Sequence, residues 1–266
     1  MGEGAREGTP VTAAAAGSRE GSVALRLDRV SRSFGGLVAV HDVDLVVPQG
    51  ERRAVIGPNG AGKTTLFNLI AGELTVSSGA IHLFDEEITG LPPHRRAGLG
   101  LARTFQITNL FPSLSALENC LLAVQGLDRA KFAMLRPLER FPHLRAQALH
   151  TLRAVGLDGR AAVPVRNLSH GEQRQLEIGL ALAARPRLLL LDEPTAGLSP
   201  GESRLMADLL RRLDPAMTVL IIEHDMDIAL EIAGHVTVLH YGRVIADGSR
   251  EDVKSDPLVR EIYLGA

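Results

Sequence analysis

Hydrophobic residues recur at two spacings along the chain, and the change between them separates expected strands from expected helices. Apolar residues at helical spacing predict helices over residues 63–74, 202–213 and 226–233. Between 109 and about 185 the pattern is helical, with few β-branched runs and several interrupting prolines. Short apolar runs bounded by turn residues predict strands over 23–30, 43–47, 52–56, 81–84, 187–191, 218–222, 236–240 and 243–246.

The order of these segments predicts an α/β fold made of three parts. Strands that alternate with helices after residue 186 indicate a mostly parallel sheet. The earliest strands predict a small antiparallel β layer beside it. The helical stretch, about 107–176, is then an insertion within one domain that covers 23–266. We expect residues 1–22, which mix Gly, Ala, Glu and Arg, to form a disordered lead-in.

One glycine-rich segment between a predicted strand and a predicted helix follows the P-loop pattern G-x-x-x-x-G-K-T. Its glycines allow successive backbone N–H groups to surround a polyphosphate, beside the positive end of the helix. Lys63 adds a positive charge for the β- and γ-phosphates, and Thr64 offers a hydroxyl to Mg²⁺. The predicted nucleotide-binding residues are Gly57, Pro58, Asn59, Gly60, Ala61, Gly62, Lys63, Thr64 and Thr65.

Two acids end the apolar strand Leu188–Leu191 and complete the Walker B pattern. A carboxylate at the end of a strand beside a P-loop suits Mg²⁺ or its water ligands, and Asp192 has that position. Glu193, one residue later, suits a general base or a residue that orients the attacking water. The plainer alternative is that two acids merely end a strand where it leaves the core; the preceding P-loop favours the functional interpretation.

Bulk composition narrows the class of protein. The 266 residues carry a formal net charge of −2, which argues against nucleic-acid binding driven by bulk electrostatics. A single cysteine, Cys120, excludes an internal disulfide framework and fits a reducing compartment. No apolar run approaches the roughly 18 residues of a membrane helix, so at a membrane another protein would have to span it.

The segment Leu168–Gln173 reads LSHGEQ and resembles the LSGGQ signature of ATP-binding cassette (ABC) proteins; the resemblance covers nearly all of the chain after residue 22. It implies a P-loop (RecA-like) core, ATP and Mg²⁺ as cofactors, and ATP hydrolysis coupled to transport. It also implies that the signature contacts the γ-phosphate bound to a second copy. Ser169 with Glu172 also fits a simple helix capping box. The signature residues are Ser169, His170, Gly171, Glu172 and Gln173, with His170 and Glu172 departing from the usual pattern.

The same resemblance assigns further residues. Gln106 matches the Q-loop glutamine, and His224 matches the switch histidine that contacts the γ-phosphate. Phe34 occupies the position of the aromatic that stacks on adenine. Ser199 stands where the D-loop usually has Asp, which puts a charge contact across a dimer in doubt. The resemblance therefore implies Glu193, His224 and Gln106 as catalytic residues, and Thr64, Gln106 and Asp192 as the Mg²⁺ site.

Several stretches are similar to the longer of the two ATPases of branched-chain amino acid importers. This similarity implies membrane permease subunits and a second ABC ATPase subunit, identical or not, as partners. It implies a periplasmic or extracellular binding protein as an indirect partner, and a peripheral location at the cytoplasmic face of the cell (inner) membrane. The stretches are 33–37, 100–106, 110–112 with 118–119, 262–265, and an insertion over about 125–145.

Other functions within the ABC family stay open at this stage. Urea and short-chain amide importers and lipopolysaccharide export use very similar ATPases, so transported substrate and direction are undecided. A soluble ABC ATPase acting on DNA or the ribosome is a different class. Such proteins usually carry a second cassette, a long coiled coil or zinc-binding cysteines, whereas this chain shows one cassette and one cysteine. We therefore expect no nucleic acid among its partners. An inactive regulatory cassette is disfavoured because every ATP-handling position is occupied.

Overall fold

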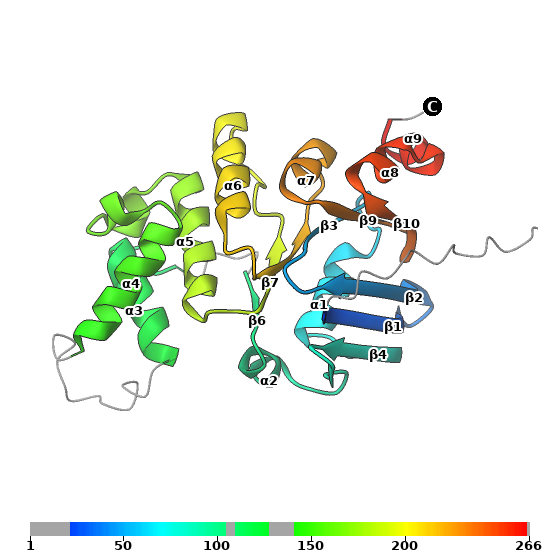
Figure 1. Cartoon of the computed structure of the whole chain (residues 1–266), viewed down its shortest axis with the longest axis horizontal. Helices are drawn as coiled ribbons and strands as arrows, with labels where there is room; N and C mark the ends of the chain where they lie inside the picture. Colours follow the sequence, from blue (N-terminus) through cyan, green and yellow to red (C-terminus); the bar gives the residue numbers. More distant parts are fainter. Residues whose placement is uncertain (1–21, 105–109, 128–140, 265–266) are drawn as a thin grey trace, which may run out of the picture.

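The structure is a computed structural model that describes residues 22–104, 110–127 and 141–264. Its centre is a six-stranded sheet in the order β10-β9-β3-β8-β7-β6 (Figure 1). All neighbours pair in parallel except β10, which pairs antiparallel with β9, as the alternation of strands and helices predicted. The strands are β3 (Arg52–Ile56), β6 (Leu101–Arg103), β7 (Leu188–Asp192), β8 (Thr218–Ile222), β9 (His235–His240) and β10 (Arg243–Ser249).

A second, antiparallel sheet confirms the expected β layer, in the order β2-β1-β4-β5. Its first two strands are longer than the hydrophobic alternation predicted. The reason is a series of register shifts in their pairing, with Arg29 and Asp42 both at positive φ, which breaks the alternation without ending the strands. The strands are β1 (Val23–Phe34), β2 (Leu37–Pro48), β4 (Ser78–Leu83) and β5 (Glu86–Glu87).

The two faces of the central sheet pack against different layers. Along β7, Leu188 and Leu190 belong to the cluster that contains α1 (Lys63–Ala71) and the antiparallel sheet. Leu189 and Leu191 instead join the cluster that contains α6 (Pro200–Arg212) and the helical insertion. Because successive strand residues point to opposite faces, a continuous apolar run is required here. Helix α1 is thereby held between the two sheets (Figure 1).

The helices between β6 and β7 in the chain pack together at one end of the molecule (Figure 1). They are α3 (Ala116–Leu127), α4 (Pro142–Ala154) and α5 (His170–Ala183), with two short 3₁₀ turns, Asp158–Arg160 and Val165–Asn167. The remaining helices are α2 (Pro93–Gly98), α7 (Met226–Ile232), α8 (Arg250–Ser255) and α9 (Pro257–Leu264). Within the described ranges, none of these helices is long and apolar enough to cross a membrane.

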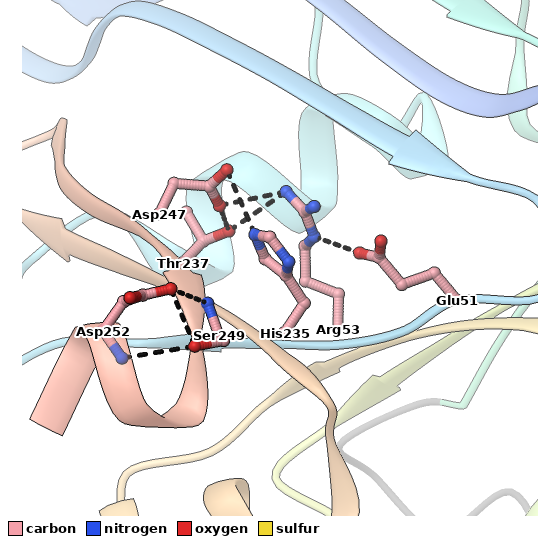
Figure 2. Close-up of polar contacts among 7 residues, drawn as sticks. All are labelled: Glu51, Arg53, His235, Thr237, Asp247, Ser249 and Asp252. Atoms are coloured by element: carbon pink, nitrogen blue, oxygen red, sulfur yellow. Dashed lines mark hydrogen bonds and ion pairs between the residues drawn. The ribbon is translucent and has the colours of Figure 1, made fainter. Parts of the chain in front are cut away.

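A buried arginine fastens the C-terminal hairpin to the start of β3 (Figure 2). Arg53 is 2% exposed, and its guanidinium lies 2.6 Å from Glu51 Oε1 and 3.0 Å from Asp247 Oδ1. Thr237 Oγ1 donates to the same Asp247 oxygen at 2.6 Å, and His235 Nε2 lies 3.3 Å from the other. Burial acts to raise the pKa of Asp247, but these polar neighbours outweigh burial and leave the pKa below its ordinary value.

Candidate nucleotide-binding site

The P-loop occupies the turn between the central strand β3 and helix α1, as the sequence predicted. Two of its glycines have no room for a side chain. A Cβ on Gly57 would lie 2.2 Å from the Leu239 carbonyl oxygen, and one on Gly62 would lie 2.4 Å from that of Ala39. The loop therefore packs tightly against β2 and the end of β9, and only glycine fits at these two positions. Such a glycine-rich backbone can offer its N–H groups to an anion.

Lys63 lies inside this loop and is 6% exposed. Its Nζ donates to the carbonyl oxygens of Gly57 at 2.6 Å and Pro58 at 3.1 Å. Burial lowers the pKa of Lys63, while the charges of Glu193 and Asp192 act in the opposite direction. The two acids predicted for hydrolysis and metal binding are thus close enough to the P-loop lysine to influence its ionisation.

Asp192 ends β7 with a side chain that is fully buried. Its Oδ2 pairs with Arg103 at 2.9 Å, and the same guanidinium also bonds Asn68 Oδ1 at 2.6 Å and Glu73 Oε2 at 3.0 Å. The second oxygen, Oδ1, has no hydrogen-bond donor among the residues that the structure describes. Asp192 therefore has a buried acceptor available for another ligand.

Glu193 has a left-handed backbone, with φ of 47°, at the point where β7 turns into the following loop. Its N–H donates to the Ile222 carbonyl at 3.0 Å, which ties this turn to the end of β8. A positive φ at a non-glycine residue is strained and is common at functional sites, where the surrounding structure maintains it. The strand ladder maintains it here.

The residues after β8 meet the loop after β7. Glu223 is fully buried, and its Oε1 accepts hydrogen bonds from Thr195 Oγ1 at 2.8 Å and Thr195 N at 3.2 Å. His224 follows with a side chain that is 57% exposed, its Nδ1 3.9 Å from Glu223 Oε2. The predicted switch histidine is therefore available to a ligand, and a buried carboxyl group lies behind it.

The signature residues begin helix α5 with the expected capping box. Ser169 Oγ accepts from the Glu172 backbone at 3.2 Å, and Glu172 Oε2 accepts from the Ser169 backbone at 2.8 Å. Gly171 packs against Glu202, and a Cβ there would lie 2.9 Å from Glu202 Oε1. Gln173 donates to loop carbonyls at Val165 and Leu168, at 3.3 and 3.2 Å.

The signature helix and the P-loop helix belong to different parts of one chain. Helix α5 contributes to the cluster of the helical insertion and α6, whereas α1 contributes to the cluster between the sheets. Among the predicted site residues, Asp192 and Glu193 both lie near enough to Lys63 for their charges to act on it. Of the other predicted site residues, Phe34 is 42% exposed at the end of β1, with the Arg32 guanidinium 4.6 Å from its ring centre. Gln106 lies outside the described residues.

The donor set suits Mg²⁺, which usually takes one or two protein oxygens together with phosphate and water. Asp192 offers its unpartnered buried Oδ1, and Thr64 is exposed at the first turn of α1. In the part of the chain that the structure describes, no group of three or more His, Cys, Asp or Glu is arranged for a metal. A magnesium ion held by these two residues would take its remaining ligands from the nucleotide phosphates and from water.

Three residues near the site were missed by the reasoning from sequence. Arg103 pairs with Asp192, Glu223 accepts hydrogen bonds from Thr195, and Tyr263 of α9 packs against the cluster that contains Ile56, the residue just before the P-loop. Burial raises the pKa of the Tyr263 phenol, and the backbone of Gly57 beside it acts in the opposite direction. The only available signals were that Arg103 and Glu223 flank predicted motifs and that Tyr263 lies in the family-like C-terminal stretch.

Comparison with known proteins agrees with this geometry. A family model described as ABC transporter matches residues 40–196. A second, described as branched-chain amino acid ATP-binding cassette transporter, matches residues 243–266. The chain is 40% identical to the branched-chain amino acid transport ATP-binding protein BraF of Pseudomonas aeruginosa, over 91% of this chain and 97% of that protein. It is 37% identical to LivG of Escherichia coli, with the same coverage.

Solved structures show the same fold. The ADP conformation of the ATP-binding cassette MJ1267 matches with a TM-score of 0.80 and 31% identity, over 92% of this chain and 99% of that one. A dimeric, post-hydrolysis structure of the cassette MJ0796 bound to ADP and Pi matches with a TM-score of 0.71 and 26% identity, over 85% and 98%. Motifs, fold and relatives agree: the chain belongs to the ABC transporter family and is a transport ATPase of that family.

Proposed function

We propose that this ATPase powers the uptake of branched-chain amino acids through partner permeases. The observation that carries the proposal is the C-terminal segment, because residues 243–266 match the model of the branched-chain amino acid cassettes. Within that segment, β10 and α8 pack on β9, and Tyr263 of α9 packs against the cluster that contains Ile56 of β3, the strand before the P-loop. BraF and LivG, which are named as high-affinity branched-chain amino acid transport proteins, support the same substrate class.

For hydrolysis, we assign each step to a residue of the site. The backbone of Gly57–Thr65 and the Lys63 ammonium bind the phosphates, and Phe34 offers its exposed ring to adenine. Glu193 orients or deprotonates the attacking water, His224 contacts the γ-phosphate, and Gln106 reaches Mg²⁺ or the attacking water. Mg²⁺ held by Thr64, Asp192 and Gln106 would neutralise charge that develops on the phosphates.

A complete site would need a second cassette. We propose a head-to-tail dimer, with an identical or a different ABC ATPase, in which Ser169–Gln173 of one subunit face the γ-phosphate bound to the other. The dimeric structure of the similar cassette MJ0796 supports this arrangement. ATP would stabilise the closed pair by binding both surfaces, and loss of the γ-phosphate would release it.

The surface of the helical insertion carries exposed apolar side chains that suit a permease contact. Phe111 is 55% exposed, and Leu122 of α3 is 43% exposed. The Phe111 backbone is held by a buried amide: its N–H donates to Asn119 Oδ1 at 2.8 Å, and its carbonyl accepts from Asn119 Nδ2 at 3.2 Å. Asn119 thus maintains an apolar ring on the surface, where a permease segment at the cytoplasmic face of the membrane would cover it.

Transport of radiolabelled leucine tests the substrate. In a strain of the source organism that lacks this gene, the wild-type chain should restore leucine uptake, and the matched Glu193→Gln chain should not. Purification of a tagged chain from membranes should recover permeases and a second ATPase. Unchanged leucine uptake in the deletion strain would overturn the proposal. A defect in urea uptake or in lipopolysaccharide export would then identify the alternative, since the export protein LptB of Acidithiobacillus ferridurans is also 37% identical.

A further inference from the structure

Glu223 is a fully buried acid that none of the steps above uses. One of its oxygens, Oε2, has no hydrogen-bond donor among residues 22–104, 110–127 and 141–264. A buried carboxyl oxygen without a donor is unfavourable, and such an atom in a native fold requires an explanation. Glu223 Oε2 is therefore an acceptor available to a neighbouring donor.

The rest of Glu223 is fixed in place. Its Oε1 accepts two hydrogen bonds from Thr195, one from the hydroxyl at 2.8 Å and one from the backbone N–H at 3.2 Å. Its own N–H donates to the Val55 carbonyl at 3.3 Å, beside the P-loop strand. These bonds leave the carboxyl group little freedom to turn, so the position of Oε2 is determined by the fold.

The ring of His224 is a candidate donor to this oxygen. Its Nδ1 lies 3.9 Å from Glu223 Oε2, about 1 Å beyond the usual N–H···O distance. The histidine is more than half exposed, so its ring can make this small movement. Burial has the largest effect and raises the pKa of Glu223, while the hydrogen bonds from Thr195 and the charge of His224 act in the opposite direction. The histidine therefore favours the ionised carboxylate, which is the form that can accept its proton.

We infer that Glu223 is a positioning residue for His224. When the site closes on ATP, Glu223 Oε2 accepts the Nδ1 proton of His224, and the ring then presents Nε2 to the γ-phosphate. The two ring nitrogens point in different directions, so a fixed partner for one determines what the other can contact. The inference rests on the role proposed above for His224 and adds the group that orients it.

Glu223→Gln provides the first test, because the Thr195 N–H needs an acceptor. The glutamine would keep its oxygen toward Thr195 and turn its NH₂ group toward His224, where it cannot accept the Nδ1 proton. We expect kcat for ATP to fall at least about tenfold, with the Kd for ATP changed less than about twofold. Glu261→Gln, the same change at an exposed glutamate of α9, is the matched control, and its kcat should stay at the wild-type value. An equal loss of kcat in the control would contradict the inference.

A double-mutant comparison separates this inference from the proposed function. His224→Ala alone tests the histidine: wild-type turnover in that variant would remove the proposed role of His224. If His224→Ala slows hydrolysis, Glu223→Gln should change kcat less than about twofold in that background. A full additional loss of kcat would show that Glu223 acts through another group than His224. That result would overturn this inference and leave the proposed transport function standing.

Nitrogen NMR of the full-length chain gives a readout that does not require turnover. The sample would contain ¹⁵N-histidine in the Glu193→Gln background with Mg²⁺ and ATP. Of the nine histidines, His224 is assigned as the signal missing in His224→Ala. We expect a protonated Nδ1 when Glu223 is present, and a change of tautomer or proton occupancy when the sample also carries Glu223→Gln. Identical His224 signals in the two proteins would overturn the inference.

Discussion

At the scale of single residues, the P-loop lysine shows how the site is prepared for phosphate. Lys63 donates to two carbonyl oxygens of its own loop, and two acids lie near enough to affect its pKa. A phosphate oxygen carries more negative charge than a carbonyl oxygen and forms a stronger hydrogen bond with an ammonium group. ATP would therefore take over a donor that the loop already holds in position.

Replacing Lys63 by Ala should weaken ATP binding by at least about tenfold, because a charge-assisted contact to the phosphates is lost. Titration with a fluorescent ATP analogue measures the change. Lys254→Ala is the control, since Lys254 is exposed on α8 and the affinity should stay at the wild-type value. Wild-type affinity in the Lys63 variant would argue against its role in the P-loop.

Glu193→Gln should retain ATP binding and lower kcat by about 10²–10⁴-fold, because an amide cannot accept the proton of the attacking water. Steady-state phosphate release measures turnover, and the same fluorescent titration measures binding. Glu261→Gln, an exposed change on α9, is the matched control. Sustained hydrolysis by Glu193→Gln near the wild-type rate would show that another group activates the water.

At the scale of elements, helix caps and one buried arginine hold the site-bearing segments. Helices α5, α6 and α8 all begin with a serine cap and an acid three residues later. Ser199, which stands in the usual Asp position of the D-loop, is the cap of α6. Arg53 in turn joins β3, which leads into the P-loop, to the C-terminal hairpin.

Asp247→Asn should lower the free energy of unfolding by about 1 kcal/mol at neutral pH, because Arg53 loses a charged partner whose side chain is 40% exposed and therefore partly screened by solvent. The folded pKa of Asp247 lies below its ordinary value of 3.8, so its contribution is present above pH 3.8 and is lost as the pH falls through the folded value. The difference between variant and wild type should shrink over that acidic range. Urea unfolding at a series of pH values measures it, with exposed Glu251→Gln as control. A difference that is independent of pH would contradict this account.

At the scale of the whole molecule, the proposed head-to-tail dimer places the P-loop of one chain opposite Ser169–Gln173 of a second, which makes assembly depend on the nucleotide. In size-exclusion chromatography, the Glu193→Gln protein with Mg²⁺ and ATP should elute as a dimer of cassettes. If the pair is heteromeric, the sample must also contain the partner ATPase. The same protein with ADP should elute as a monomer, because ADP lacks the γ-phosphate that joins the surfaces. An elution volume independent of nucleotide would contradict the head-to-tail model.

The permease surface also belongs to this scale. Phe111→Ala should leave ATP binding and thermal stability near wild type, because the ring is largely exposed. It should reduce leucine uptake several-fold, because docking to the permease loses about 1–2 kcal/mol. Transport and melting temperature are measured on the same variant. Leu258→Ala removes an exposed leucine on α9, away from the insertion, and serves as control. Equal uptake by wild type and Phe111→Ala would exclude this ring as a docking residue.

Much of the fold was predictable from local pattern. The strands at 218–222 and 187–191 and the helices after them appear at or near the expected bounds, because fully buried parallel strands need continuous apolar runs. Strand β6 and helices α2, α8 and α9 were not predicted, since three to eight residues carry too little periodicity. The bounds of the insertion and the site roles stay predictions, and Gln106 lies outside the described residues.

The sequence by itself determined the family and the chemical types at the site, because phosphate binding imposes short motifs whose residues are neighbours in the chain. Only the tertiary structure decided which distant groups support those motifs. Arg103 meets Asp192 across 89 positions, Glu223 meets Thr195 across 28, and Arg53 meets Asp247 across 194. Such contacts depend on strand order and burial, which place residues from separate elements side by side, and no local pattern carries that information.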